Sequence, residues 1–121
     1  MSIPVLICDD SALARKQVKK SLPQGWDIDV SMVTNGREAI DYLRANRVGI
    51  MFLDLTMPEI DGIGVLEINK AEKLVDFVVV VSADIQPDMK KKVESLGALA
   101  FINKPVSTDK LNNILKDYGL L

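Results

Sequence analysis

A run of four apolar residues that ends in a single acid constrains this chain more than any other feature. Residues 50–53 (Ile-Met-Phe-Leu) lead directly into Asp54, and the loop that follows contains Pro58 and Gly62. A short, continuous apolar run bounded by turn residues is typical of a strand that is buried on both faces of a sheet. Open α/β sheets place their chemistry at the carboxyl ends of such strands, so Asp54 is the first candidate functional residue. Taken alone, Asp54 could simply begin a turn.

The same succession of apolar run, turn and amphipathic segment recurs along the whole chain. We expect strands at residues 5–8, 28–33, 50–53, 77–81 and 99–102, and helices at residues 12–22, 36–46, 63–73, 87–96 and 108–117. The fourth strand should be buried from Phe77 onwards, whereas Ile28, Val30 and Met32 should share the one covered face of a second strand near the sheet edge. Alternation of this kind predicts an α/β fold, a doubly wound parallel sheet with helices on both faces, and we expect residues 1–121 to form one such domain.

Composition excludes several classes of protein. The 121 residues carry a net charge of −2, so we expect no direct contact with nucleic acid. No apolar run approaches the roughly 20 residues that cross a bilayer, and no signal peptide is visible, so we expect no membrane contact and a cytoplasmic location. The chain contains no histidine, which excludes Ser-His-Asp and Cys-His nucleophiles. The single cysteine, Cys8, lies in an apolar run and is predicted to be a buried structural thiol.

Polar residues follow four of the five predicted strands. Asp9 and Asp10 follow the first strand, Asp54 the third, Ser82 the fourth and Lys104 the fifth. Carboxyl ends of a doubly wound sheet meet at one edge, so these side chains should share a pocket. Three carboxylates raise each other's pKa unless a cation intervenes, and oxygen-only ligands suit Mg²⁺. With a lysine and a hydroxyl added, the set suits phosphoryl transfer, with Asp54 as the nucleophile that becomes an aspartyl phosphate.

Each of these residues also has a plain structural explanation. Asp9 and Asp10 suit the amino end of a helix through its dipole, Ser82 suits a turn, and Lys104 suits a solvated surface. The functional interpretation therefore depends on a coincidence, namely that four strand ends carry these groups in this chain order.

Over its whole length the chain resembles the receiver domain of two-component response regulators, close in size to the single-domain chemotaxis regulator. The resemblance rests on Asp9-Asp10 after the first strand, DLTMPEIDG at residues 54–62, Ser82-Ala83 after the fourth strand and Lys104-Pro105 after the fifth. It implies a flavodoxin-like, five-stranded parallel sheet in the order 2-1-3-4-5 with five helices. It also implies a phosphoacceptor that takes a phosphoryl group from a histidine kinase in the presence of Mg²⁺ and then switches its partner-binding surface.

The resemblance implies a role for each matched acid. Asp54 would be the phosphoacceptor, and Asp10, Asp54 and the main-chain carbonyl of Thr56 would ligate Mg²⁺, with Asp9 acting through water. The positions that tune phosphate lifetime in the family fall on Thr56 and Asp84. The direction of that tuning stays open, because an acid at position 84 could either order or repel the attacking water.

The resemblance also implies how the phosphate is held and sensed. Ser82 and Lys104 would bind the phosphate, and the Lys104–Pro105 peptide bond would be cis. Ser82 would move towards the phosphate, and Phe101 would follow it into the vacated space as the switch residue. Phe101 could instead be an ordinary, half-exposed strand residue.

The implied partners are proteins at each end of a signalling step. The phosphodonor would be a sensor histidine kinase or a phosphotransfer protein, which must be another molecule or domain because this chain has no histidine. It would dock on the first helix near Ala12, Leu13 and Lys16. A downstream protein target, or an output domain in a longer chain, would read a face that contains Met89, Lys90, Lys91, Phe101 and Lys110.

Three alternatives come from other classes of protein. A hydrolase of the haloacid dehalogenase type would carry a second Asp two places after its nucleophile, but Ser11 and Thr56 occupy those places here. In a flavodoxin the Asp9-Asp10 pair would repel the bound phosphate. An unphosphorylated pseudo-receiver used as a protein-binding module usually lacks an acid or the lysine.

We therefore expect a chain that catalyses only its own phosphorylation and dephosphorylation. We expect a stand-alone regulator, with a receiver from a longer chain as the open alternative.

Overall fold

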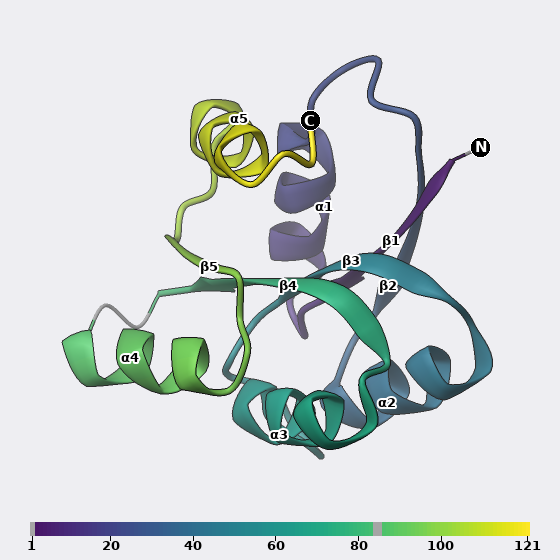
Figure 1. The fold of residues 1–121 in the computed structure, drawn as a ribbon, viewed down its shortest axis with the longest axis vertical. Coiled ribbons are helices and arrows are strands. Elements are labelled where there is room, and N and C mark those ends of the chain that lie inside the picture. Colours follow the sequence, from purple (N-terminus) through teal and green to yellow (C-terminus); the bar gives the residue numbers. More distant parts are fainter. Residues whose placement is uncertain (1, 84–85) are drawn as a thin grey trace.

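The computed structural model describes residues 2–83 and 86–121, in which one five-stranded parallel sheet lies between two layers of helices (Figure 1). The strands are β1 (Ile3–Cys8), β2 (Ile28–Val33), β3 (Val48–Leu53), β4 (Val75–Ser82) and β5 (Ala100–Asn103). The helices are α1 (Ala12–Ser21), α2 (Gly36–Ala45), α3 (Gly62–Glu72), α4 (Pro87–Ser95) and α5 (Thr108–Asp117). The strand order is β2-β1-β3-β4-β5, so the expected doubly wound, flavodoxin-like fold is confirmed. All ten elements begin and end within two residues of the predicted positions.

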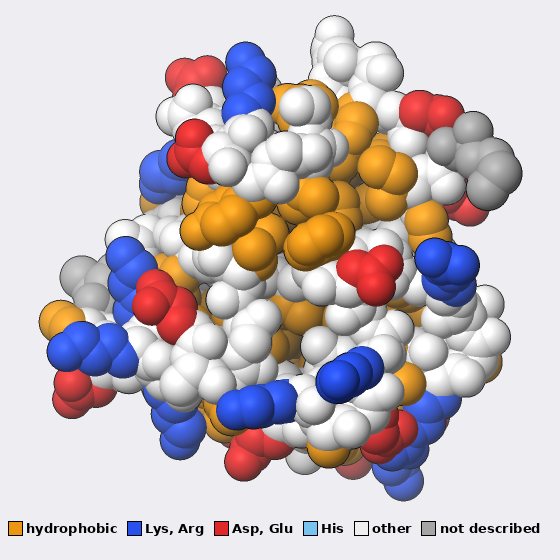
Figure 2. Space-filling model, in the orientation of Figure 1, with side chains coloured by type: hydrophobic (Ala, Val, Ile, Leu, Met, Phe, Trp, Pro, Cys, Tyr) orange, Lys and Arg blue, Asp and Glu red, His pale blue; other side chains and the backbone are white. Residues whose placement is uncertain are grey.

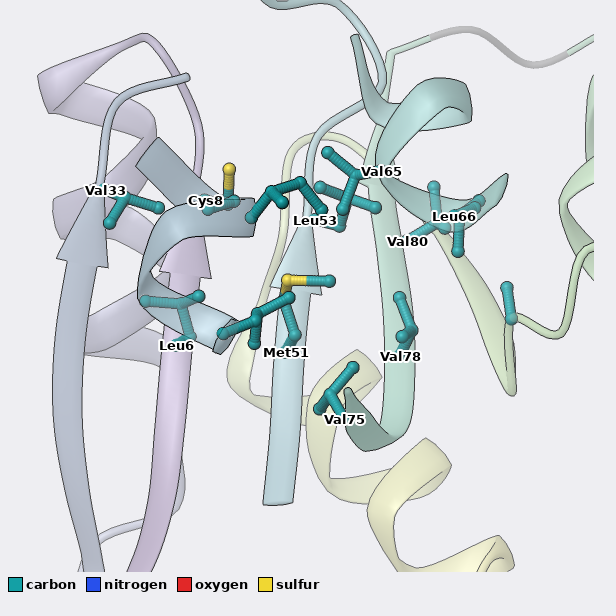
Figure 3. Packing of buried hydrophobic residues seen from close by; sticks show 14 of the residues in the cluster. Leu6, Cys8, Val33, Met51, Leu53, Val65, Leu66, Val75, Val78 and Val80 are labelled. Carbon is teal, nitrogen blue, oxygen red and sulfur yellow. The ribbon is translucent and has the colours of Figure 1, made fainter. Parts of the chain in front are cut away.

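The interior strands are apolar throughout because helices cover both faces of the sheet. In Figure 1, α1 and α5 lie on one face and α2, α3 and α4 lie on the other. Leu6, Met51 and Val78 come from three neighbouring strands and pack side by side under α2 and α3 (Figure 3). The alternate residues, such as Ile7 and Phe52, pack against α1 and α5. A continuous apolar run is therefore what these strands require.

Two residues are more exposed than the sequence pattern predicted. Met32 and Phe77 each keep 37% of their surface accessible, so the prediction that both are covered is wrong. Met32 lies on β2, which has a neighbouring strand on one side only. Phe77 pairs with Ile50 of β3 but has no partner on β5, because pairing with β5 begins only at Val79, opposite Ala100. Side chains at such positions remain partly open to water.

Side-chain caps begin the helices just beyond the carboxyl ends of the strands. The hydroxyl of Ser11 accepts from the backbone N–H of the third residue of α1, at 3.2 Å, and Asp61 and Ser107 play the same part for α3 and α5. These caps satisfy N–H groups that a helix leaves unpaired at its first turn. They also fix where the chain turns away from the sheet, and therefore where the residues after each strand lie.

The surface carries both signs of charge. Figure 2 shows an apolar area near the middle of one face, with lysine, arginine and acidic side chains around it. Within residues 2–83 and 86–121, no helix combines the length and the apolar character needed to cross a membrane.

Candidate functional site

The acids and the lysine singled out from the sequence meet at the carboxyl edge of the sheet. Asp9 and Asp10 follow β1, and Asp54 follows β3, which pairs directly with β1. The backbone N–H of Asp54 donates to the carbonyl of Cys8 at 2.9 Å and continues that pairing beyond the strands. Ser82 is the last residue of β4, and it is buried. Parallel pairing therefore places four strand ends around one site.

The three carboxylates form one close cluster. One oxygen from each of Asp9, Asp10 and Asp54 lies within 4.8 Å of the others. Asp9 and Asp54 are 2% and 6% exposed, whereas Asp10 is open to solvent. Buried like charges at this range require a positive charge between them. The donor set is made only of oxygen atoms and includes one accessible acid, so it fits a hard divalent cation such as Mg²⁺.

The side chain of Lys104 supplies positive charge at the two buried acids. Its Nζ lies 2.9 Å from Oδ2 of Asp9 and 3.3 Å from Oδ1 of Asp54. The backbone N–H of Lys104 donates to the carbonyl of Ser82 at 2.9 Å, which ties the loop after β5 to the end of β4. The Lys104–Pro105 peptide bond is cis. These contacts bring a cation, two carboxylates and the end of β4 into one arrangement.

The electrostatics of the site follow from this packing. Burial raises the pKa of the Asp54 carboxyl, the charge of Asp9 raises it further, and the Lys104 ammonium opposes the rise. Burial by itself would lower the pKa of Lys104, but its hydrogen bond to Asp9 and the charge of Asp54 hold it above its ordinary value. The ammonium is therefore firmly protonated, and Asp54 lies where additional positive charge would stabilise its ionised form.

Asp9 has a second set of partners that the sequence analysis missed. Its Oδ1 accepts from the backbone N–H of Ser11 at 2.9 Å, and its carbonyl accepts from Nη1 of Arg15 at 2.8 Å. Arg15 is half-buried against this turn, although arginine is usually a solvent-exposed residue. The sequence signal for this contact is spacing, because Arg15 lies four residues after the capping Ser11 and therefore above the same turn.

The loop between β3 and α3 approaches the site too closely to leave room for a side chain. A Cβ atom at Gly62 would collide with the carbonyl oxygen of Asp54 and lie 2.6 Å from Cα of Leu55. A Cβ atom at Gly36, the first residue of α2, would collide with the carbonyl of Ile60 in the same loop. Glycine at these two positions lets the loop pack directly against the phosphoacceptor candidate. Thr56 is exposed in this loop.

Cys8 is the last residue of β1 and directly precedes Asp9 of the acidic cluster. It is 1% exposed, and its Sγ is 3.3 Å from Sδ of Met57. Burial raises the pKa of the thiol to about 12, and the charges of Asp9 and Asp54 contribute to the rise. The prediction of a buried thiol is confirmed.

The remaining predicted residues lie outside the acidic cluster. Phe101 is half-buried in β5 and lines a cavity of about 280 Å³ with Pro87 and Lys90 of α4. On α1, Leu13 is 77% exposed and lines a cavity of about 800 Å³ between α1 and the start of α5. Asp84 lies outside the described residues.

Comparison with known proteins agrees with this geometry. The family model for the response regulator receiver domain matches residues 5–116. A protein-glutamate methylesterase/protein-glutamine glutaminase of Rhodospirillum rubrum is 37% identical over 109 residues, which cover 89% of this chain and 30% of that protein. The chain thus spans about a third of the length of the curated relatives it matches.

Two solved structures extend the comparison. A chain of the CheX–CheY–BeF₃–Mg²⁺ complex of Borrelia burgdorferi is 31% identical, with a TM-score of 0.84, and the match covers 98% of this chain and 90% of that one. The chemotaxis response regulator CheY4 of Vibrio cholerae also has a TM-score of 0.84, over 97% of this chain and 98% of that one. At 22% identity it shows the fold alone.

Proposed function

This chain belongs to the response regulator receiver domain family, and from that membership we propose that Asp54 accepts a phosphoryl group from a histidine kinase or a phosphotransfer protein. One observation carries the proposal. The ammonium of Lys104 lies between two buried carboxylates, 2.9 Å from Asp9 and 3.3 Å from Asp54. A fixed cation beside a nucleophilic acid supplies the positioning and the charge neutralisation that phosphoryl transfer requires.

In the proposed reaction a phosphohistidine donates its phosphoryl group to the Asp54 carboxylate. The P–N bond of the donor breaks, its electron pair stays with the imidazole, and a P–O bond to Asp54 forms. Lys104 would neutralise charge on one phosphoryl oxygen, and the hydroxyl of Ser82, at the end of β4, would donate to another. Catalysis by this chain is limited to gaining and losing its own phosphoryl group.

We further propose that Asp10, Asp54 and the main-chain carbonyl of Thr56 hold Mg²⁺, with Asp9 acting through water. A bound Mg²⁺ ion supplies positive charge that offsets the carboxylates and the phosphoryl oxygens. Support comes from the three carboxylate oxygens within 4.8 Å and from the presence of Mg²⁺ and BeF₃ in the named complex of the Borrelia relative.

The proposed signalling surfaces lie on two sides of the site. The donor would dock on α1 at Ala12, Leu13 and Lys16, where an exposed leucine borders a cavity. The phosphate would change the face formed by α4, β5 and α5, with Ser82 and Phe101 as the switch residues. Half-burial of Phe101 beside a cavity supports this role, because the ring has space into which it could move.

Intact-mass spectrometry with acetyl phosphate tests the proposal. The wild type should gain one labile phosphoryl group in the presence of Mg²⁺, and Asp54→Asn should gain none. Asp76→Asn, which removes an exposed acid of β4, is the matched control and should behave as the wild type. A folded wild type that gains no phosphoryl group would contradict the proposal and favour the alternative of an unphosphorylated protein-binding module.

A further inference from the structure

The side chain of Lys110 binds the backbone on both sides of Lys104. Its Nζ donates to the carbonyl of Asn103 at 3.2 Å and to the carbonyl of Pro105 at 3.0 Å. These are the residues immediately before and after Lys104. A single ammonium thus binds the carbonyls of the two residues that flank Lys104, whose own side chain faces Asp9 and Asp54.

The position of Lys110 is unfavourable for the helix that carries it. It lies in the first turn of α5, where the helix dipole disfavours a cation. Lysine is no better than several neutral residues as a helix former. Helix stability therefore does not explain a lysine at this position, whereas the two carbonyl contacts do.

The loop between β5 and α5 depends on bonds from other elements. Residue 105 is proline and has no N–H to donate. Beside the two contacts of Lys110, the carbonyl of Val106 accepts from Nε2 of Gln17 on α1 at 3.5 Å. The N–H of Lys104 donates to Ser82 on β4. Lys110 provides two of these bonds, so its loss should free the carbonyls of the residues on both sides of Lys104.

We propose that Lys110 is a positioning residue for Lys104. It fixes the backbone on each side of Lys104, and so holds the ammonium of Lys104 at the distance from Asp54 that phosphoryl transfer needs. The inference rests on the proposed function of Asp54 and Lys104. Because Lys110 is exposed on α5, the same contacts link the proposed output face to the phosphate site.

A kinetic double-mutant cycle tests whether Lys110 acts through Lys104. The measured quantity is the rate constant of phosphoryl uptake from acetyl phosphate with Mg²⁺. Lys110→Met should lower it by about fivefold to tenfold, because a 1 Å misplacement of a catalytic group costs about 100-fold and the contacts of Lys104 to Asp9 and Ser82 remain to limit the displacement. Lys110→Arg, which keeps the donors, should restore most of the rate. Lys116→Met, the same change in the last turn of the same helix, should leave it unaltered.

The decisive measurement is the effect of Lys110→Met in a protein that already carries Lys104→Met. There Lys110→Met should have no further effect, because the group that it positions is gone. An equal loss of rate in both backgrounds, or no loss in either, would overturn the proposal.

Amide hydrogen exchange gives a test that does not depend on phosphorylation. The N–H of Lys104, bonded to Ser82, should exchange about tenfold faster in Lys110→Met than in the wild type, and at the wild-type rate in Lys116→Met. A wild type that takes no phosphoryl group would refute the proposed function, and exchange alone would then decide the positioning. Unchanged exchange at Lys104 in Lys110→Met would show that Lys110 does not hold this loop.

Discussion

Replacing Gly62 with alanine should destabilise the protein, although helix propensity alone predicts the opposite. Gly62 is the first residue of α3, and alanine is favoured over glycine by at most about 1 kcal/mol in a helix. The new Cβ would collide with the carbonyl oxygen of Asp54 and lie 2.6 Å from Cα and 2.9 Å from Cδ2 of Leu55. Two of these three atoms belong to the backbone just after β3, so they cannot move aside as a flexible side chain could.

The free-energy cost of this collision can be set against the gain in helix propensity. Forcing a methyl group into a packed site costs about 1–3 kcal/mol, and more where backbone must shift. The net free energy of unfolding should therefore fall by about 1–2 kcal/mol, which lowers the melting temperature of a domain of this size by about 3–8 °C. Phosphoryl uptake from acetyl phosphate should slow as well, because the displaced backbone carries Asp54.

Urea unfolding of Gly62→Ala beside Gly49→Ala is the assay. Gly49 lies in β3, and a Cβ there would meet only Cγ2 of Ile3 at 3.1 Å and the carbonyl oxygen of Pro4 at 3.6 Å. Removing a glycine from a strand stabilises it by about 0.5–1 kcal/mol, so this variant should equal or exceed the wild type in stability. A Gly62→Ala protein as stable as Gly49→Ala would refute the reasoning from close approach.

Three further predictions concern single residues. Without metal, Asp54→Asn should unfold at a higher urea concentration than the wild type at pH 7, because the raised pKa of Asp54 means that its charge opposes folding. The folded state binds the Asp54 proton more tightly than the unfolded state, so wild-type stability should fall as the pH rises above the ordinary pKa of 3.8. This fall should be smaller in Asp54→Asn, and an identical pH profile in the two proteins would contradict the assignment. Glu59 has a φ of 69°, in the left-handed region, so Glu59→Asn should raise the free energy of unfolding by about 0.5–1 kcal/mol, as read from urea curves, and a loss of stability would contradict it. The thiol of Cys8, 1% exposed and with its pKa raised to about 12, should react with a thiol reagent at pH 8 at least 100-fold more slowly in the folded protein than in urea, and equal rates would show that the thiol is accessible.

The elements and the cluster of strand ends could be predicted because their causes are local or topological. The apolar run before Asp54 requires two covered faces, and a parallel sheet then brings the residues after β1, β3 and β5 to one edge. Lys104 and Lys110 differ in how far their positions can be predicted. Lys104 directly follows a strand, so topology alone places it, whereas Lys110 reaches the site only through the path of the preceding loop.

Exposure at the margins of the sheet and second contacts to the site were not predictable in this way. Met32 and Phe77 have the side chains of buried strand residues, but their exposure depends on where neighbouring strands begin and end. The long side chain of Arg15 reaches from α1 back to the carbonyl of Asp9. Such contacts depend on the reach of a side chain in three dimensions, which residue spacing does not record.

The most direct test of the account identifies the residue that carries the phosphoryl group. The protein would be incubated with Mg²⁺ and acetyl phosphate, treated with borohydride to reduce an acyl phosphate to an alcohol, and digested for peptide mass spectrometry. We predict homoserine at position 54 and unmodified aspartate at positions 9 and 10, with no homoserine when Mg²⁺ is withheld. Reduction at Asp9 or Asp10 with Asp54 intact, or homoserine that forms equally without metal, would contradict the proposal that Asp54 is the phosphoacceptor of a Mg²⁺-dependent receiver.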